Sequence, residues 1–159
     1  MNTDAPARTE SPAPAVCAAD VRRAFDGLPS KRRFSAAQRE LVHRLAFAAL
    51  AAGELASARR YYEWLVVYGG AEARAWRGLA ASAHALGRYG EALMHWTMVS
   101  LLEPGAADAT LYAGRCQAQL GQVAEAVASF ELVRRDQAAD ASLREQATQL
   151  LALLQRRAA

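Results

Sequence analysis

The residues of this sequence that could do acid–base, nucleophilic or metal chemistry are few and widely spaced. The three histidines are His43, His84 and His95, and the two cysteines are Cys17 and Cys116. No histidine lies in an HExxH motif, and the cysteines are too far apart for a CxxC motif. The sequence also lacks a GxxxxGK[ST] loop, a Rossmann glycine pattern and a GxSxG motif. We therefore predict no cofactor, no metal and no catalytic site, and we expect a protein that is not an enzyme.

The charge and the composition indicate a cytoplasmic protein that does not bind nucleic acid and does not insert stably into a membrane. The 19 basic and 16 acidic side chains leave a net charge of only +3. The tight basic run at 31–33 is interpreted as a solvated linker, because nucleic-acid binding would need a basic stripe with stacking aromatics. Residues 1–19 lack the apolar core expected of a signal peptide, and no apolar stretch approaches the roughly 18 residues of a membrane span. Cys116 is expected to be a reduced, buried residue of a helix.

The N-terminal part of the chain is expected to contribute little to the core. Residues 1–18 are rich in Ala, Pro, Ser and Thr and are predicted to be a disordered tail. Residues 19–35 are predicted to form a short helix, about Ala19 to Gly27, and a linker. Ser35 has the side chain of an N-cap for the helix that follows.

After residue 35 the sequence repeats itself with a period of 34 residues. Gly53, Gly87 and Gly121 recur at this spacing, and apolar residues of matching size keep their places relative to the glycines. The corresponding sets are Ala46, Ala80 and Gly114; Ala58, Ala92 and Ala126; Tyr62, Trp96 and Phe130; and Leu65, Val99 and Val133. A 34-residue period is the signature of the tetratricopeptide repeat (TPR). The sequence therefore predicts an all-α TPR solenoid of three repeats.

Each repeat is expected to be a pair of antiparallel helices. The glycine ends the first helix at a positive φ, small alanines let the two helices cross closely, and the aromatic residue fills the gap toward the next unit. The three TPR units, at about 39–72, 73–106 and 107–140, make up the region 36–140, with helices at 36–52, 55–68, 72–86, 89–102, 106–120 and 123–136. Residues 141–159 are predicted to form a capping helix, about Asp140 to Arg157, with the apolar face Leu143, Ala147, Leu150, Leu151 and Leu154.

The first helices of the units line the concave face of a TPR solenoid, and on this face we expect a protein or peptide partner. The predicted peptide-binding groove consists of His43, Phe47, Leu50, Arg77, Ala81, His84, Leu111, Arg115 and Ala118. Its apolar members would accept anchor side chains of an extended peptide, and its Arg and His members would bind carbonyl or carboxylate groups. For Phe47 and Leu50 there is an alternative: they would pack on a neighbouring helix and not line the groove. Trp64, Trp76 and Trp96 are expected in the core, and His95 is expected to pack or to lie on the surface.

Several segments resemble those of a known family. They are Ala46-Phe47 through Gly53-Glu54 to Ala58, then 77–81, 86–89 with Ala92, 101–104, 111–116 and 120–121. In this order, over about residues 36–136 and between an N-terminal and a C-terminal helix, they are similar to the class II chaperones of bacterial type III secretion. Those chaperones hold hydrophobic translocator subunits in the cytoplasm before export.

The resemblance implies a function as well as a fold. The groove would bind a short N-terminal segment of a secreted translocator through spaced Pro and Leu anchors, and the N-terminal helix, with Val21, Arg22, Phe25 and Leu28, would take part in a homodimer. The sequence departs from the family at three positions. Members of the family commonly have tyrosines at the positions of His43 and Leu50, and an acidic residue at the position of Arg115. Two alternatives stay open: a TPR co-chaperone of secretion needle subunits, and a general TPR adaptor outside secretion.

Overall fold

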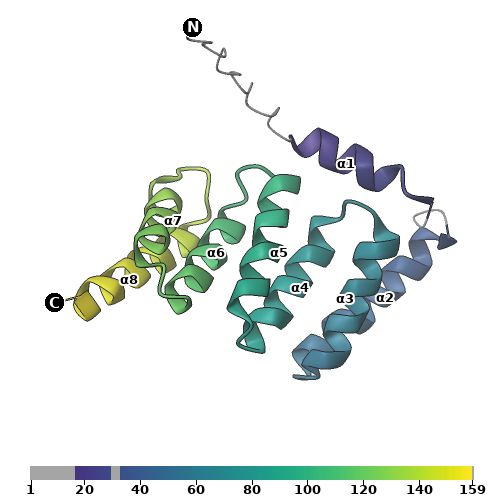
Figure 1. Ribbon diagram of the computed structural model, residues 1–159, viewed down its shortest axis with the longest axis horizontal. Helices are drawn as coiled ribbons and strands as arrows, with labels where there is room; N and C mark the ends of the chain where they lie inside the picture. The colour runs from purple at the N-terminus through teal and green to yellow at the C-terminus, as the bar shows by residue number, and fades with distance from the viewer. Residues whose placement is uncertain (1–16, 30–32, 159) are drawn as a thin grey trace, which may run out of the picture.

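The computed structural model describes residues 17–29 and 33–158 of the chain, and this part is built from helices (Figure 1). The helices are α1 (Ala18–Asp26), α2 (Ala36–Ala51), α3 (Leu55–Gly69), α4 (Ala73–Ala85), α5 (Tyr89–Leu102), α6 (Ala107–Gln119), α7 (Val123–Arg135) and α8 (Ala141–Ala158). Helices α2 to α7 form three antiparallel hairpins in a row, and α8 packs on α7 at the C-terminal end. The all-α TPR prediction is confirmed.

The expected helix bounds agree with the observed ones to within one residue at every end. Parts of two other expectations, the tail at 1–16 and the basic residues Lys31 and Arg32, lie outside the described residues. The boundaries between the tail, the TPR units and the cap stay predictions.

Local sequence signals account for the positions of the helix ends. Gly53, Gly87 and Gly121 have φ values of 76°, 72° and 76°, in the left-handed region that a glycine adopts without a steric penalty. At the start of α2, the backbone N–H of Gln38 donates to the hydroxyl of Ser35, and the backbone N–H of Ser35 donates to the side chain of Gln38. This reciprocal capping box satisfies two backbone donors at the helix start.

The core lies between successive hairpins, as expected for a solenoid. Ala58, Ala92 and Ala126 are fully buried where the helices of each pair cross. Cys116 is also fully buried, and burial raises the pKa of its thiol to about 11. Trp96 belongs to the buried core, whereas Trp64 and Trp76 are half-buried and pack against its edge.

The C-terminal helix covers the open end of the third hairpin. Ala147 and Leu151 of α8 are buried against α7, and the remaining members of the predicted apolar face, Leu143, Leu150 and Leu154, are half-buried against the same core. The predicted apolar face is therefore confirmed.

Helix α1 lies across the ends of the solenoid helices and contacts α5 (Figure 1). Its Phe25 ring meets the Trp76 ring edge-on at 6.2 Å, and its Arg22 guanidinium donates to the carbonyl of Leu102. Val21 packs against the core cluster that contains Trp96 and Leu102. Most of the face expected to form a dimer therefore contacts the same chain, and Leu28, two residues beyond the end of α1, is its exposed apolar member.

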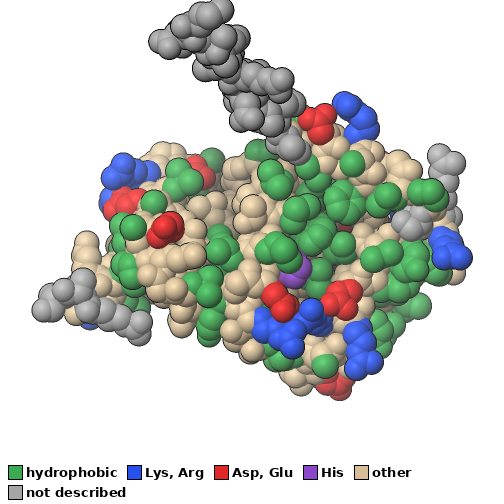
Figure 2. Space-filling view, in the orientation of Figure 1, with side chains coloured by type: hydrophobic (Ala, Val, Ile, Leu, Met, Phe, Trp, Pro, Cys, Tyr) green, Lys and Arg blue, Asp and Glu red, His purple; other side chains and the backbone are tan. Residues whose placement is uncertain are grey.

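Hydrophobic side chains also reach the surface beside α1 and over α3 and α5 (Figure 2). Val67 of α3 is 52% exposed and Met94 of α5 is 56% exposed. Single exposed apolar residues are common on protein surfaces, and nothing in the fold requires a partner for these two.

Candidate functional site

A cavity of about 390 Å³ opens between the first helices of the three hairpins. This volume lies within the range of protein sites that accept ligands. The cavity is lined by residues of α2 to α6, namely Leu50, Tyr62, Arg77, Gly78, Ala81, His84, Trp96, Tyr112 and Arg115. We call it the first cavity. Its lining combines apolar walls with a small number of polar groups, which is the composition of a site that binds and orients a ligand.

Two aromatic contacts build the walls of the first cavity. On one side the ring of Tyr62 lies against Gly78, where a β-carbon would overlap the ring. On the other side the rings of Trp96 and Tyr112 stack, with centroids 5.0 Å apart and an interplanar angle of 15°. Burial raises the pKa of Tyr62, so its hydroxyl is protonated at neutral pH.

Arg77 joins the second unit to the third. Its Nε donates to Asp108 at 2.7 Å, and its Nη2 donates to Glu103, also at 2.7 Å. Burial alone would raise the pKa of Asp108, but the hydrogen bond and charge of Arg77 outweigh it and hold the pKa below its ordinary value. The hydrogen bond to Asp108 is likewise the main reason why the pKa of Arg77 is raised. The positive charge of Arg77 is therefore balanced by these carboxylates, and the residue links α4 to α6 at the wall of the cavity.

Arg115 has a different environment. The central carbon of its guanidinium lies 5.3 Å from the centroid of the Tyr112 ring, which is within cation–π range. Close by, the His84 ring meets the Tyr89 ring edge-on at 5.3 Å. Burial lowers the pKa of His84, and the charge of Arg115 lowers it further. At neutral pH the imidazole of His84 is therefore uncharged and can donate one hydrogen bond and accept another.

A second cavity, of about 200 Å³, adjoins the first toward the C-terminal helix. Its lining comes from α4, α6, α7 and α8: His84, Arg115, Ala118, Gln119, Phe130, Leu150, Leu153 and Leu154. His84 and Arg115 line the two cavities together, so a chain that extends from one cavity to the other passes these two side chains.

Most of the groove residues expected from the sequence line these cavities. They are Leu50, Arg77, Ala81, His84, Arg115 and Ala118. Phe47 is 65% exposed on α2 and lines neither cavity. Its alternative assignment as a packing residue is not supported by this exposure. Leu50, in contrast, is half-buried and also packs against the core between α2, α3 and α4.

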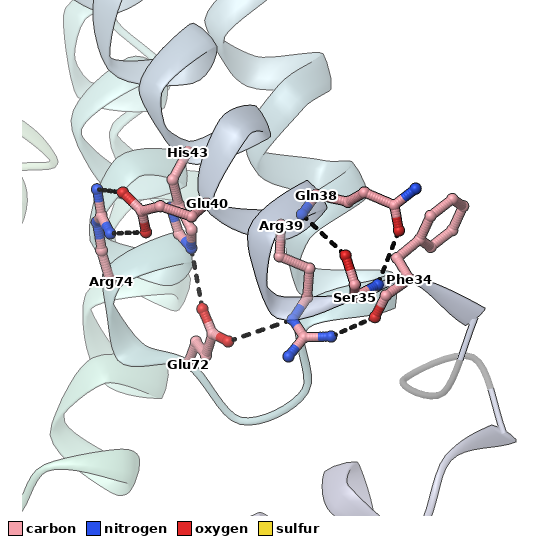
Figure 3. A network of polar contacts seen from close by, with 8 residues as sticks. All are labelled: Phe34, Ser35, Gln38, Arg39, Glu40, His43, Glu72 and Arg74. Carbon is pink, nitrogen blue, oxygen red and sulfur yellow. Dashed lines mark hydrogen bonds and ion pairs between the residues drawn. The ribbon is translucent and has the colours of Figure 1, made fainter.

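The structure corrects the assignment of His43. This residue is only 2% exposed, and its Nε2 lies 2.9 Å from a carboxylate oxygen of Glu72 at the start of α4 (Figure 3). Arg39 contacts the other oxygen of Glu72, while Arg74 pairs with Glu40 at 2.8 Å. These polar contacts join the first hairpin to the second, so His43 lies within the junction and does not face the groove.

Leu111 is also corrected. It is fully buried in the core cluster formed with Phe130, Val133 and α8. The next residue of α6, Tyr112, lines the first cavity in the place expected for Leu111. Side chains one residue apart point about 100° apart around a helix, so Leu111 can lie in the core while Tyr112 lines the first cavity.

Sequence reasoning missed four residues of the first cavity: Tyr62, Gly78, Trp96 and Tyr112. Tyr62 and Trp96 were assigned to packing between units, and they are indeed buried, but one side of each also lines the cavity. Gly78 and Tyr112 are 34 residues apart and therefore occupy the same place in their units. That shared position, one turn from Ala81, was the signal that could have identified them.

The described residues contain no group of three or more His, Cys, Asp or Glu side chains that could hold a metal ion. Within this same part of the chain, every helix is too short or too polar to cross a bilayer. The arrangement can bind an extended chain through apolar anchors and a few polar groups.

Comparison with known proteins places this geometry in context. The tetratricopeptide-repeat family model matches residues 43–96 and 99–142, which together make up more than half of the chain. A comparison with curated proteins finds no match to the sequence.

Solved structures of similar fold include PcrH from Pseudomonas aeruginosa. It shares 26% identity at a TM-score of 0.73, and the match covers 80% of this chain and 99% of that chain. The Yersinia enterocolitica type III secretion translocator chaperone SycD shares 21% identity at a TM-score of 0.72, covering 79% and 89% of the two chains. PcrH in complex with the chaperone binding region of PopD matches at 24% identity and a TM-score of 0.71, covering 80% and 98%.

Proposed function

Because the chain belongs to the tetratricopeptide-repeat family, we propose that it is a chaperone that binds a translocator subunit of a type III secretion system in its concave groove. The observation that carries the proposal is the first cavity, which has aromatic walls and lies on the inner face of the solenoid. The similarity to PcrH bound to the chaperone binding region of PopD supports the choice of client. The client segment would be short, extended and anchored by apolar side chains.

The cavity residues divide into three roles in this proposal. Leu50 and Ala81, with the rings of Trp96 and Tyr112, form the apolar pocket for an anchor side chain. His84 is uncharged at neutral pH and supplies a hydrogen bond to the client backbone. Arg77 keeps α4 and α6 at a fixed separation through Asp108 rather than binding the client.

In this role the protein would work in the cytoplasm and would not be an enzyme. A translocator is held before its export, so the chaperone would act in the cytoplasm. Its work would be binding alone, with no reaction and no cofactor. A homodimer through α1 stays a prediction, and Leu28, which lies just beyond the C-terminal end of α1, is the exposed apolar residue left to support it.

Co-expression tests the proposal and separates the clients. The tagged chain is produced with candidate translocators and, separately, with secretion needle subunits. Candidate translocators are sought among the neighbouring genes as large proteins with paired membrane-spanning segments. We expect the translocator to co-purify in a soluble complex, as read by size-exclusion chromatography and mass spectrometry.

Two other results would contradict the proposal. Recovery of the needle subunit alone would favour the co-chaperone alternative. If the tagged chain is folded and no secretion protein co-purifies with it, the remaining alternative is a general TPR adaptor outside secretion.

A further inference from the structure

The two arginines of the first cavity differ in whether their charge is balanced. Arg77 contacts two carboxylates, those of Asp108 and Glu103. Arg115 has no carboxylate partner among residues 17–29 and 33–158, and its guanidinium lies over the Tyr112 ring. The groove therefore carries one cation whose hydrogen-bond donors are not used by an acidic side chain of the described chain.

The surroundings of Arg115 leave its charge uncompensated. No Asp or Glu lines the first cavity or the second within the described residues. Asp108, the acidic residue on the inner side of the same helix, is bound to Arg77. His84 is uncharged at neutral pH, since burial and the nearby Arg115 lower its pKa. A partly buried cation of this kind interacts strongly with an added opposite charge, because the surrounding protein screens less than water does.

The position of Arg115 shows where such a charge would lie along a bound chain. Arg115 lines the first cavity on one side and the second cavity on the other. The second cavity is apolar at its far end, where Leu150, Leu153 and Leu154 of α8 meet Phe130. An extended segment with one apolar anchor in each cavity therefore places an intermediate residue beside Arg115.

We propose that Arg115 selects an acidic side chain in the bound segment, between an apolar anchor in the first cavity and another in the second. This inference rests on the proposed function, because it takes the groove to bind an extended polypeptide. The guanidinium has five N–H donors in a fixed fork, and a carboxylate accepts two of them at once. A backbone carbonyl presents one oxygen and no full charge, so it satisfies the site less well.

The experiment begins with a library of displayed random dodecapeptides selected on the folded wild-type protein. A selected peptide that contains Glu is then synthesised beside its Glu→Gln isostere, and the affinity of each is measured by fluorescence anisotropy at low and high salt. The variants are Arg115→Gln and, as a matched control for loss of one positive charge, Arg60→Gln on the exposed side of α3. Thermal melts establish that each variant is folded.

We expect the wild-type selection to be enriched in Asp or Glu between two apolar positions. The wild type and Arg60→Gln should prefer the Glu peptide over the Gln peptide by about tenfold at low salt, and the preference should shrink at high salt. In Arg115→Gln the two peptides should bind equally.

Two results overturn the inference in distinguishable ways. Selected peptides with apolar anchors but no acidic position would reject a role of Arg115 in selection and leave the groove as the binding site. Peptides that bind Ala81→Trp as well as wild type, or a selection that yields no binder, would reject the groove itself and with it the proposed function.

Discussion

The junction between α3 and α4 and the junction between α5 and α6 occupy the same place in successive repeats, yet they are packed differently. In the first, the Tyr62 ring lies against a glycine, Gly78. In the second, 34 residues later, Trp96 stacks on a second ring, Tyr112. The repeat thus determines where the aromatic residue of the second helix lies, and the residue opposite determines whether that junction is filled by one ring or by two.

This difference shapes the groove. Gly78 allows the Tyr62 ring to approach the backbone of α4, so this junction is sensitive to any added atom. The Trp96–Tyr112 pair instead presents flat aromatic surface to the first cavity and depends on the size of both side chains. The first junction should respond mainly to overpacking, and the second mainly to truncation.

The largest effect is expected from truncation at the second junction. Trp96→Ala removes a side chain that is 5% exposed and leaves a large void, so it should lower the free energy of unfolding by about 3–5 kcal/mol. Urea unfolding followed by circular dichroism measures this change. A loss below about 1 kcal/mol would show that this ring is not part of the core.

A smaller loss is expected from overpacking at the first junction. In Gly78→Ala the new methyl group overlaps the buried Tyr62 ring, and the strain should cost about 1–3 kcal/mol of unfolding free energy. Gly90→Ala is the matched control, because Gly90 is also helical and has open space where its β-carbon would lie. The control should gain up to about 1 kcal/mol from helix propensity. Equal effects of the two substitutions would mean that Tyr62 does not occupy this position.

The ion pair that links the two junctions should give a pH dependence. The pKa of Asp108 is lower in the folded protein than its ordinary value, so the associated stability is present above that ordinary value of 3.8 and is lost as the pH falls through the folded pKa. Arg77→Gln should remove this acid-dependent part of the stability, about 1 kcal/mol, since the pair is one-third exposed. As the pH is lowered from 7 to 3, the melting temperatures of the wild type and of Arg77→Gln should converge. Curves that stay parallel would show that the Arg77–Asp108 pair is not the origin of the pH dependence.

The smallest effect is expected outside both junctions. Phe47 is 65% exposed and lines neither cavity, so Phe47→Ala should change the unfolding free energy by less than about 0.5 kcal/mol. Client affinity should also stay within about twofold of wild type. A tenfold loss of affinity without loss of stability would extend the groove along α2, as the sequence first indicated.

The fold could be predicted from the sequence because its signals are local and recur. Gly53, Gly87 and Gly121 adopt a positive φ at the end of the first helix of each repeat, and their 34-residue spacing sets the register of the repeats. The groove was harder to predict, because its lining depends on the rotation of each helix about its axis. One residue of rotation distinguishes buried Leu111 from Tyr112 at the cavity wall.

The pairing of charged groups could not be predicted from spacing either. His43 and Glu72 lie on successive hairpins, and nothing in the sequence shows that the carboxylate holds the imidazole inside the junction. The contrast between paired Arg77 and unpaired Arg115 has the same origin, since Asp108 and Glu103 reach only the former.

The most direct test of the account is to fill the first cavity and measure client binding. Ala81 lines that cavity, and Ala81→Trp would occupy it without removing a core side chain, whereas Ala128→Trp adds the same side chain on the exposed side of α7. Isothermal titration calorimetry with the co-purified client should show at least a tenfold weaker Kd for Ala81→Trp and a wild-type Kd for Ala128→Trp, with both variants folded. A wild-type Kd for Ala81→Trp would contradict the account and place the client on another face of the solenoid.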